Sequence, residues 1–90
     1  MKRHILLIED NEQNRYLTTF LLEKHGYRVT SAATGPAGVQ LARELLPDLI
    51  LLDVQLPGMD GYAVATALKA DARTSGIPIV VVTSCAMAGD

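Results

Sequence analysis

The sequence predicts an α/β domain built on a doubly wound parallel sheet. Four short strand-like runs alternate with longer segments that show helical spacing. Three of these runs, 5–8, 49–52 and 79–82, are apolar at every position rather than at alternate positions, which is typical of parallel strands covered on both faces. Right-handed crossovers between such strands lead to a doubly wound sheet, for which 2-1-3-4 is part of a common strand order.

The second run, 28–32, is less apolar than the others and is therefore expected at an edge of the sheet. Three helices are expected. The first covers 12–25, with Gly26 as its C-terminal cap, and carries Leu17, Phe20, Leu21 and Lys24 at helical spacing. The second opens at Thr34-Gly35-Pro36 and stops at Pro47, and the third covers 61–70 with Asp60 as N-cap. The side chains expected to face inward are Gly38, Leu41, Ala42 and Leu45 in the second helix and Ala65 and Leu68 in the third.

The composition fits one small domain, 1–90, with an aliphatic core, since 49% of the 90 residues are hydrophobic. The net charge is −2 and the eight Lys and Arg residues are scattered, which argues against direct binding of nucleic acid or of an anionic membrane. The single cysteine has no partner for a disulfide. The first apolar run is too short for a signal peptide or a membrane span, so a cytoplasmic location is expected.

Acidic and hydroxyl residues stand where three of the expected strands end. The first strand is followed by Glu9 and Asp10, the third by Asp53, and the fourth by Thr83 and Ser84. Neighbouring strands are about 4.8 Å apart, so adjacent first and third strands bring Asp10 close to Asp53, with Glu9 close behind. Two like charges about 4 Å apart repel by about 4 kcal/mol at an effective dielectric constant near 20, so this cluster needs a proton or a cation. Oxygen ligands favour Mg²⁺, beside which Asp53 is suited to attack a phosphoryl group and Thr83 to contact its oxygens.

Several of these residues also have a simpler interpretation. Asp10 or Asn11 is suited to cap the following helix, and that alternative stays open. Thr83 taken alone is best explained as an ordinary strand-end residue, and Asp60 as a helix cap. Asp53 has no such explanation, because a Pro-Gly turn follows it rather than a helix. The functional interpretation therefore depends on three acids and a hydroxyl occurring together at three strand ends.

The segments ILLIEDN, LILLDVQLPGMDG and PIVVVTS, at these spacings, closely resemble the receiver domain of two-component response regulators. The resemblance covers nearly the whole chain and is strongest to single-domain cell-division regulators and to receivers of hybrid kinases. It implies a flavodoxin-like fold and a signalling switch in which Asp53 takes a phosphoryl group from a histidine kinase or a phosphotransfer protein. The domain would then control a partner or output domain that the sequence does not identify, and it would be a substrate and switch rather than an enzyme.

The resemblance also implies a role for each site residue. The implied Mg²⁺ ligands are Asp10, Glu9 acting mainly through water, Asp53, and the main-chain carbonyl of Gln55. The implied phosphate contacts are the switch hydroxyl of Thr83 and the backbone of Ser84. Two alternatives stand beside this interpretation: a receiver-like interaction module that is not phosphorylated, and a Mg²⁺-dependent aspartyl phosphatase. Phosphatases of the haloacid-dehalogenase type place a second Asp two residues after the nucleophile, where this chain has Gln55.

The chain departs from the family pattern at its C-terminal end. Such domains have a fifth strand ending in a lysine that pairs with the phosphate, followed by a fifth helix, and no residue here can be assigned the lysine's role. The 90 residues are therefore expected to be a fragment of a longer protein or a shortened form of one. The run 79–82 would then be an exposed apolar edge, and the chain is expected to be dimeric, domain-swapped or poorly soluble through it.

Overall fold

The structure is a computed structural model that describes residues 2–53 and 61–82. The predicted N-cap at Asp60 lies outside these residues. None of the helices in the described ranges is long and apolar enough to cross a membrane. The elements, in chain order, are β1 (His4–Ile8), α1 (Glu12–Lys24), β2 (Arg28–Ala32), α2 (Gly35–Leu45), β3 (Leu49–Asp53), α3 (Gly61–Ala70) and β4 (Ile79–Val82).

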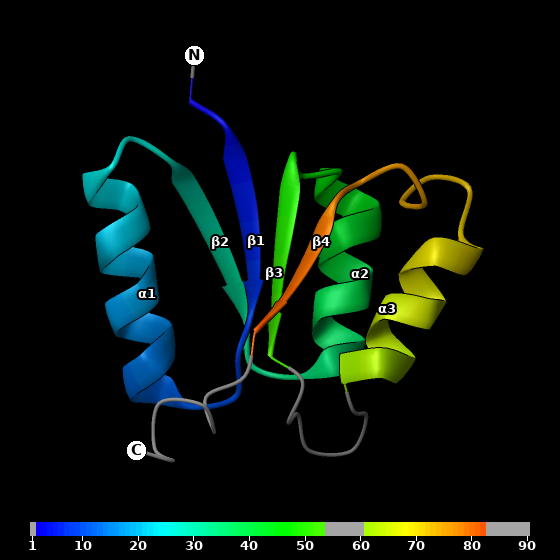
Figure 1. Cartoon of the computed structure of the whole chain (residues 1–90), viewed down its shortest axis with the longest axis horizontal. Helices are drawn as coiled ribbons and strands as arrows, with labels where there is room; N and C mark the ends of the chain where they lie inside the picture. The colour runs from blue at the N-terminus through cyan, green and yellow to red at the C-terminus, as the bar shows by residue number, and fades with distance from the viewer. Residues whose placement is uncertain (1, 54–60, 83–90) are drawn as a thin grey trace.

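The four strands form one parallel sheet in the order β2-β1-β3-β4. This confirms the predicted fold class and order, and the edge position of the second strand. Figure 1 shows α1 on one side of the sheet and α2 and α3 on the other. Because all four strands run in the same direction, their carboxyl ends line up at one end of the sheet, the carboxyl edge. The acids of the site stand at this carboxyl edge.

The main core lies between the sheet and the pair of helices α2 and α3. Alternate residues of β1 and β3 contribute to it, because successive side chains of a strand point to opposite faces. Its buried members are Leu6, Ile8, Val39, Ala42, Ile50, Leu52, Val64, Leu68 and Ile77. The core therefore packs against the same central strands that carry Glu9 and Asp53 at their ends.

The helix α2 approaches β1 very closely at Gly38. A Cβ atom on this residue would lie 2.6 Å from Cγ1 of Ile8 and would clash with its Cδ1 as well. Ala42, one turn later on the same face, is fully buried. These two small residues let α2 lie directly on β1.

The predicted inner faces of α2 and α3 are largely confirmed. Gly38, Ala42 and Leu68 are buried, and Leu41 and Ala65 pack against the core while partly exposed. The prediction for Leu45 was wrong: its side chain is 38% exposed, because α2 ends at this residue and the chain turns away through Leu46, whose φ is 48°. Val39 and Val64 occupy the core instead.

The face of the sheet that carries α1 is less fully covered. No residue of α1 is fully buried, and the side chains of Leu17, Phe20 and Leu21 are about half exposed.

Residues 80–82 of β4 are between 41% and 45% exposed. Within the described part of the chain, β4 is therefore an apolar edge strand, as the sequence predicted.

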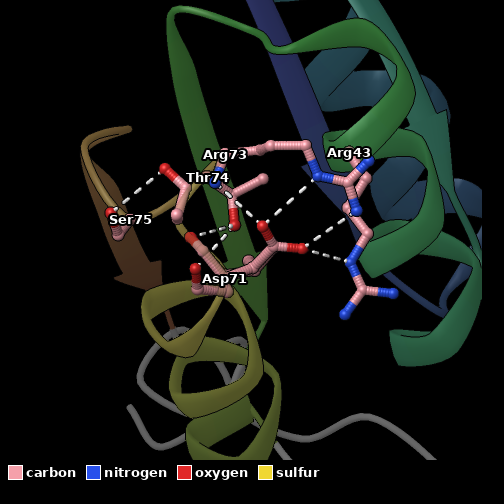
Figure 2. A network of polar contacts seen from close by, with 7 residues as sticks. Arg43, Asp71, Arg73, Thr74 and Ser75 are labelled. Atoms are coloured by element: carbon pink, nitrogen blue, oxygen red, sulfur yellow. Dashed lines mark hydrogen bonds and ion pairs between the residues drawn. The ribbon is translucent and has the colours of Figure 1, made fainter.

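A polar network fixes the loop that leads from α3 into β4 (Figure 2). The carboxylate of Asp71 accepts hydrogen bonds from the main-chain N–H of Arg73 and from Nε of Arg43 in α2, each at 2.8 Å. The N–H of Arg73, and then the two guanidinium groups, lower the pKa of Asp71. The buried hydroxyl of Thr74 donates to the carbonyl of Leu68 at 2.6 Å. The network ties the end of α3 to α2 and sets the position from which β4 begins.

Candidate metal and phosphoryl site

The pairing of β1 with β3 brings two buried acids together. Ile8, the last residue of β1, is the register partner of Leu52 in β3. The residues that follow them, Glu9 and Asp53, therefore lie at the carboxyl edge of the sheet. Both side chains are buried, with 6% of Glu9 and 1% of Asp53 exposed, whereas Asp10 is exposed. The sequence predicted Asp10 within a few ångströms of Asp53 and Glu9 close behind; extended by one residue, the register sets Glu9 opposite Asp53.

The three carboxylates nevertheless form a single cluster, as predicted. Glu9, Asp10 and Asp53 each present a carboxylate oxygen within 4.8 Å of the other two. Glu9 and Asp53 form the buried floor of this cluster and Asp10 its exposed rim. An ion bound by these oxygens would therefore meet solvent on the side of Asp10.

The backbone around Glu9 is held from several sides. Its N–H donates to the carbonyl of Ala32 at 3.0 Å, which extends the pairing of β1 and β2 by one residue. Its carboxylate accepts a hydrogen bond from the main-chain N–H of Asn11 at 3.1 Å. The sequence left Asp10 and Asn11 open as helix caps, and the structure decides for Asn11, whose Oδ1 accepts from the N–H of Asn14 at 2.9 Å. The carboxylate of Asp10 therefore belongs to the acid cluster rather than to the cap.

Burial raises the pKa of Glu9 to about 7, and a hydrogen bond with Asp53 and the charges of Asp53 and Asp10 add to the rise. The N–H of Asn11 acts in the opposite direction, because it stabilises the ionised form. In the absence of a cation, Glu9 therefore keeps its proton to a higher pH than an ordinary glutamate. A crowded set of oxygen ligands of this kind suits a hard divalent cation, which would take the place of the proton.

The remaining predicted site residues, Gln55, Thr83 and Ser84, lie outside the described residues. The described chain does bring β4 to the site, because Val82, its last residue, is the register partner of Asp53. Sequence reasoning missed Arg15, whose Nη1 donates to the main-chain carbonyl of Glu9 at 3.0 Å. Its signal was a basic residue in the helix that directly follows two acids, a pattern that does not by itself show where the side chain points.

Residues 5–90 match the response regulator receiver domain family. The chain belongs to this family. Two curated relatives are the protein PilH of Pseudomonas aeruginosa, 42% identical over 80 residues, and the polar-differentiation response regulator DivK of Brucella ovis, 42% identical over 90 residues. These matches cover 89% and 100% of this receiver domain, which spans only about two thirds of PilH (66%) and somewhat more of DivK (73%).

Solved structures show the same fold. The receiver domain of a sensor histidine kinase from Pseudomonas aeruginosa superposes with a TM-score of 0.90 and 37% identity, over 100% of this chain and 74% of that one. That structure contains a magnesium ion coordinated in its active-site cleft. The chemotaxis protein CheY4 of Vibrio cholerae superposes with a TM-score of 0.86 and 26% identity, over 90% of this chain and 68% of that one. Proteins of this family are signalling modules of two-component systems.

Proposed function

We propose that this receiver domain accepts a phosphoryl group on Asp53 from the phosphohistidine of a histidine kinase or phosphotransfer protein, with Mg²⁺ held by the neighbouring acids. One observation carries the proposal. In a chain of the receiver family, carboxylate oxygens of Glu9, Asp10 and Asp53 lie within 4.8 Å of one another at the carboxyl ends of adjacent strands. This is the edge where parallel α/β sheets bind their ligands.

The transfer conserves atoms and charge in a simple way. A carboxylate oxygen of Asp53 attacks the phosphorus of the phosphohistidine, a P–O bond forms, and the P–N bond to the imidazole breaks. The imidazole nitrogen keeps the electron pair and takes a proton from solvent. Water later attacks the phosphorus of the aspartyl phosphate, which releases inorganic phosphate and restores the Asp53 carboxylate. Asp53 is buried, so its carboxylate, the nucleophile in the first step and the leaving group in the second, has little freedom to turn.

The described residues fit a Mg²⁺ ion. They supply oxygen ligands, and the carboxylate oxygens of the three acids lie within 4.8 Å of one another. Glu9, Asp10 and Asp53, together with the main-chain carbonyl of Gln55, would hold the ion. When bound, Mg²⁺ would offset the charge on the phosphoryl oxygens that approach these acids.

The phosphoryl group would act as the switch. At neutral pH the group carries nearly two negative charges and three acceptor oxygens, in place of the single negative charge of the Asp53 carboxylate. The hydroxyl of Thr83 and the backbone of Ser84 would contact these oxygens, and their movement would bias a two-state arrangement that a partner or an output domain detects. In this proposal the domain works in the cytoplasm and is a substrate of its kinase, with at most slow loss of its own phosphate.

Incubation with a small acyl phosphate tests the proposal. With Mg²⁺ present, the protein should gain the mass of one phosphoryl group, and EDTA should prevent the gain. Asp53→Asn should abolish it, whereas Asp48→Asn, at the opposite end of the sheet, should not. No adduct in the native protein would favour an interaction module without phosphorylation. Sustained turnover of a phosphomonoester would instead favour a phosphatase.

A further inference from the structure

Arg15 connects α1 to the backbone that carries the acid pair. Its Nη1 donates to the carbonyl of Glu9 at 3.0 Å and to the carbonyl of Asp10 at 3.4 Å. Helical side chains lean toward the N-terminus of their helix, so Arg15, one turn into α1, reaches back over the connection from β1. The side chain is half-buried and its guanidinium is always charged, which strengthens both hydrogen bonds.

One peptide group is held from both of its sides. The carbonyl of Asp10 and the N–H of Asn11 belong to the same peptide, and in a trans peptide they point in opposite directions. Arg15 binds the carbonyl, while the N–H donates to the Glu9 carboxylate at 3.1 Å. A rotation of this peptide would break the hydrogen bond to Glu9 and would also redirect the side chain of Asp10. The orientations of the two acids are therefore coupled through a peptide that Arg15 restrains.

We propose that Arg15 is a positioning residue for the metal site, which keeps the carboxylates of Glu9 and Asp10 directed toward Asp53 by holding their main-chain carbonyls. The inference rests on the proposed binding of Mg²⁺ by these acids. Mg²⁺ requires near-ideal octahedral geometry, whereas Ca²⁺ accepts irregular geometry, so displaced ligands reduce Mg²⁺ affinity more. Groups that orient metal ligands without touching the metal typically account for roughly ten- to hundredfold in affinity.

The charge of Arg15 alone predicts the opposite effect. A guanidinium beside three carboxylates repels an incoming divalent cation, so its removal would tighten Mg²⁺ binding if charge were its only influence. Loss of a positioning residue weakens binding instead. The direction of the change in affinity therefore separates the two roles, and general damage to the fold can be measured separately as a lowered Tm.

The experiment is a Mg²⁺ titration of the ¹⁵N-labelled protein, followed by amide chemical shifts and by calorimetry, with a parallel Ca²⁺ titration. Arg15→Met removes the donors and keeps most of the stem, and Arg15→Lys keeps the charge but loses the planar fork. Arg28→Met is the matched control, because this exposed residue is the first residue of β2 and lies at the end of the strands away from the site. Every variant is measured well below its own Tm, and hydrogen exchange of the Asn11 amide is recorded without metal.

We expect Arg15→Met to weaken Mg²⁺ binding about tenfold, Ca²⁺ binding less, and to accelerate exchange of the Asn11 amide. Arg15→Lys should recover part of the affinity, and Arg28→Met should match the native protein. Unchanged or tighter Mg²⁺ binding in Arg15→Met would overturn the inference while leaving the proposed function intact. Absence of Mg²⁺ binding in the native protein would overturn the proposed function, and with it the role of Arg15 at a metal site.

Discussion

Replacing Asp53 with Asn should stabilise the metal-free protein at alkaline pH. At 4.8 Å, the separation within which the oxygens of the cluster lie, two unit charges repel by about 3.5 kcal/mol at an effective dielectric constant near 20. Burial is the larger cause of the raised pKa of Glu9, so Asp53 accounts for only part of the free energy that ionised Glu9 costs the folded protein. We therefore expect Asp53→Asn to add about 1–2 kcal/mol to the free energy of unfolding at pH 8, and roughly 5–10 °C to Tm.

The pH dependence of this gain follows from Glu9. Its pKa in the folded state is about 7, against an ordinary value of 4.5, so protonated Glu9 favours folding. This contribution is fully present below pH 4.5 and is lost as the pH rises through about 7. Asp53→Asn should consequently stabilise the protein at pH 8 and have much less effect at pH 5.

Urea unfolding followed by circular dichroism, in EDTA, measures both effects. The control is Glu23→Gln, an equal change of net charge at an exposed position on α1, which should alter the free energy of unfolding by less than about 0.5 kcal/mol. Adding Mg²⁺ should raise the free energy of unfolding of the native protein by more than it raises that of the Asp53→Asn variant. An Asp53→Asn protein that is no more stable than the native protein at pH 8 would refute the crowding of the acids on which the argument depends.

Three further predictions concern the metal, the core and the edge of the sheet. Mg²⁺ affinity, measured by calorimetry, should rise between pH 6 and pH 8 with release of a proton from Glu9, and an affinity that is flat over this range would contradict the raised pKa. Gly38→Ala should destabilise the fold by about 1–3 kcal/mol, because its methyl group meets Ile8, whereas Gly76→Ala, with no atom within 4 Å, should be close to neutral in the same urea titration. Finally, the chain should self-associate through β4, and Val81→Lys should shift it toward monomer in sedimentation experiments; a native protein that is monomeric at high micromolar concentration would rule this out.

The fold was largely predictable because its signals are local and strong. Continuous apolar runs at 5–8 and 49–52 require cover on both faces, and parallel strands with right-handed crossovers leave few possible orders. The gathering of Asp10 and Asp53 followed from that order alone, since adjacent parallel strands end at the same edge. The exposed edge at β4 was predicted from the family resemblance, which implies a fifth strand that these residues do not supply.

Finer details of the site depended on register and side-chain direction, which the sequence does not show. A shift of one residue decides whether Glu9 or Asp10 lies alongside Asp53, and only the pairing of Ile8 with Leu52 settles it. The role of Arg15 depends on its side chain reaching back to main-chain carbonyls, whose positions no residue type reports. Leu45 has the spacing of an inward residue, but it is the last residue of α2, and the chain turns away at Leu46.

The most direct test of the account is to locate the phosphoryl group after transfer from a phosphorylated histidine kinase or phosphotransfer protein in the presence of Mg²⁺. Trapping the acyl phosphate by reduction, followed by peptide mass spectrometry, identifies the modified residue. The account predicts modification at Asp53, dependent on Mg²⁺ and reduced strongly when Asp10 is replaced by Asn. A phosphoryl group on any other residue, or equal transfer in EDTA, would contradict it.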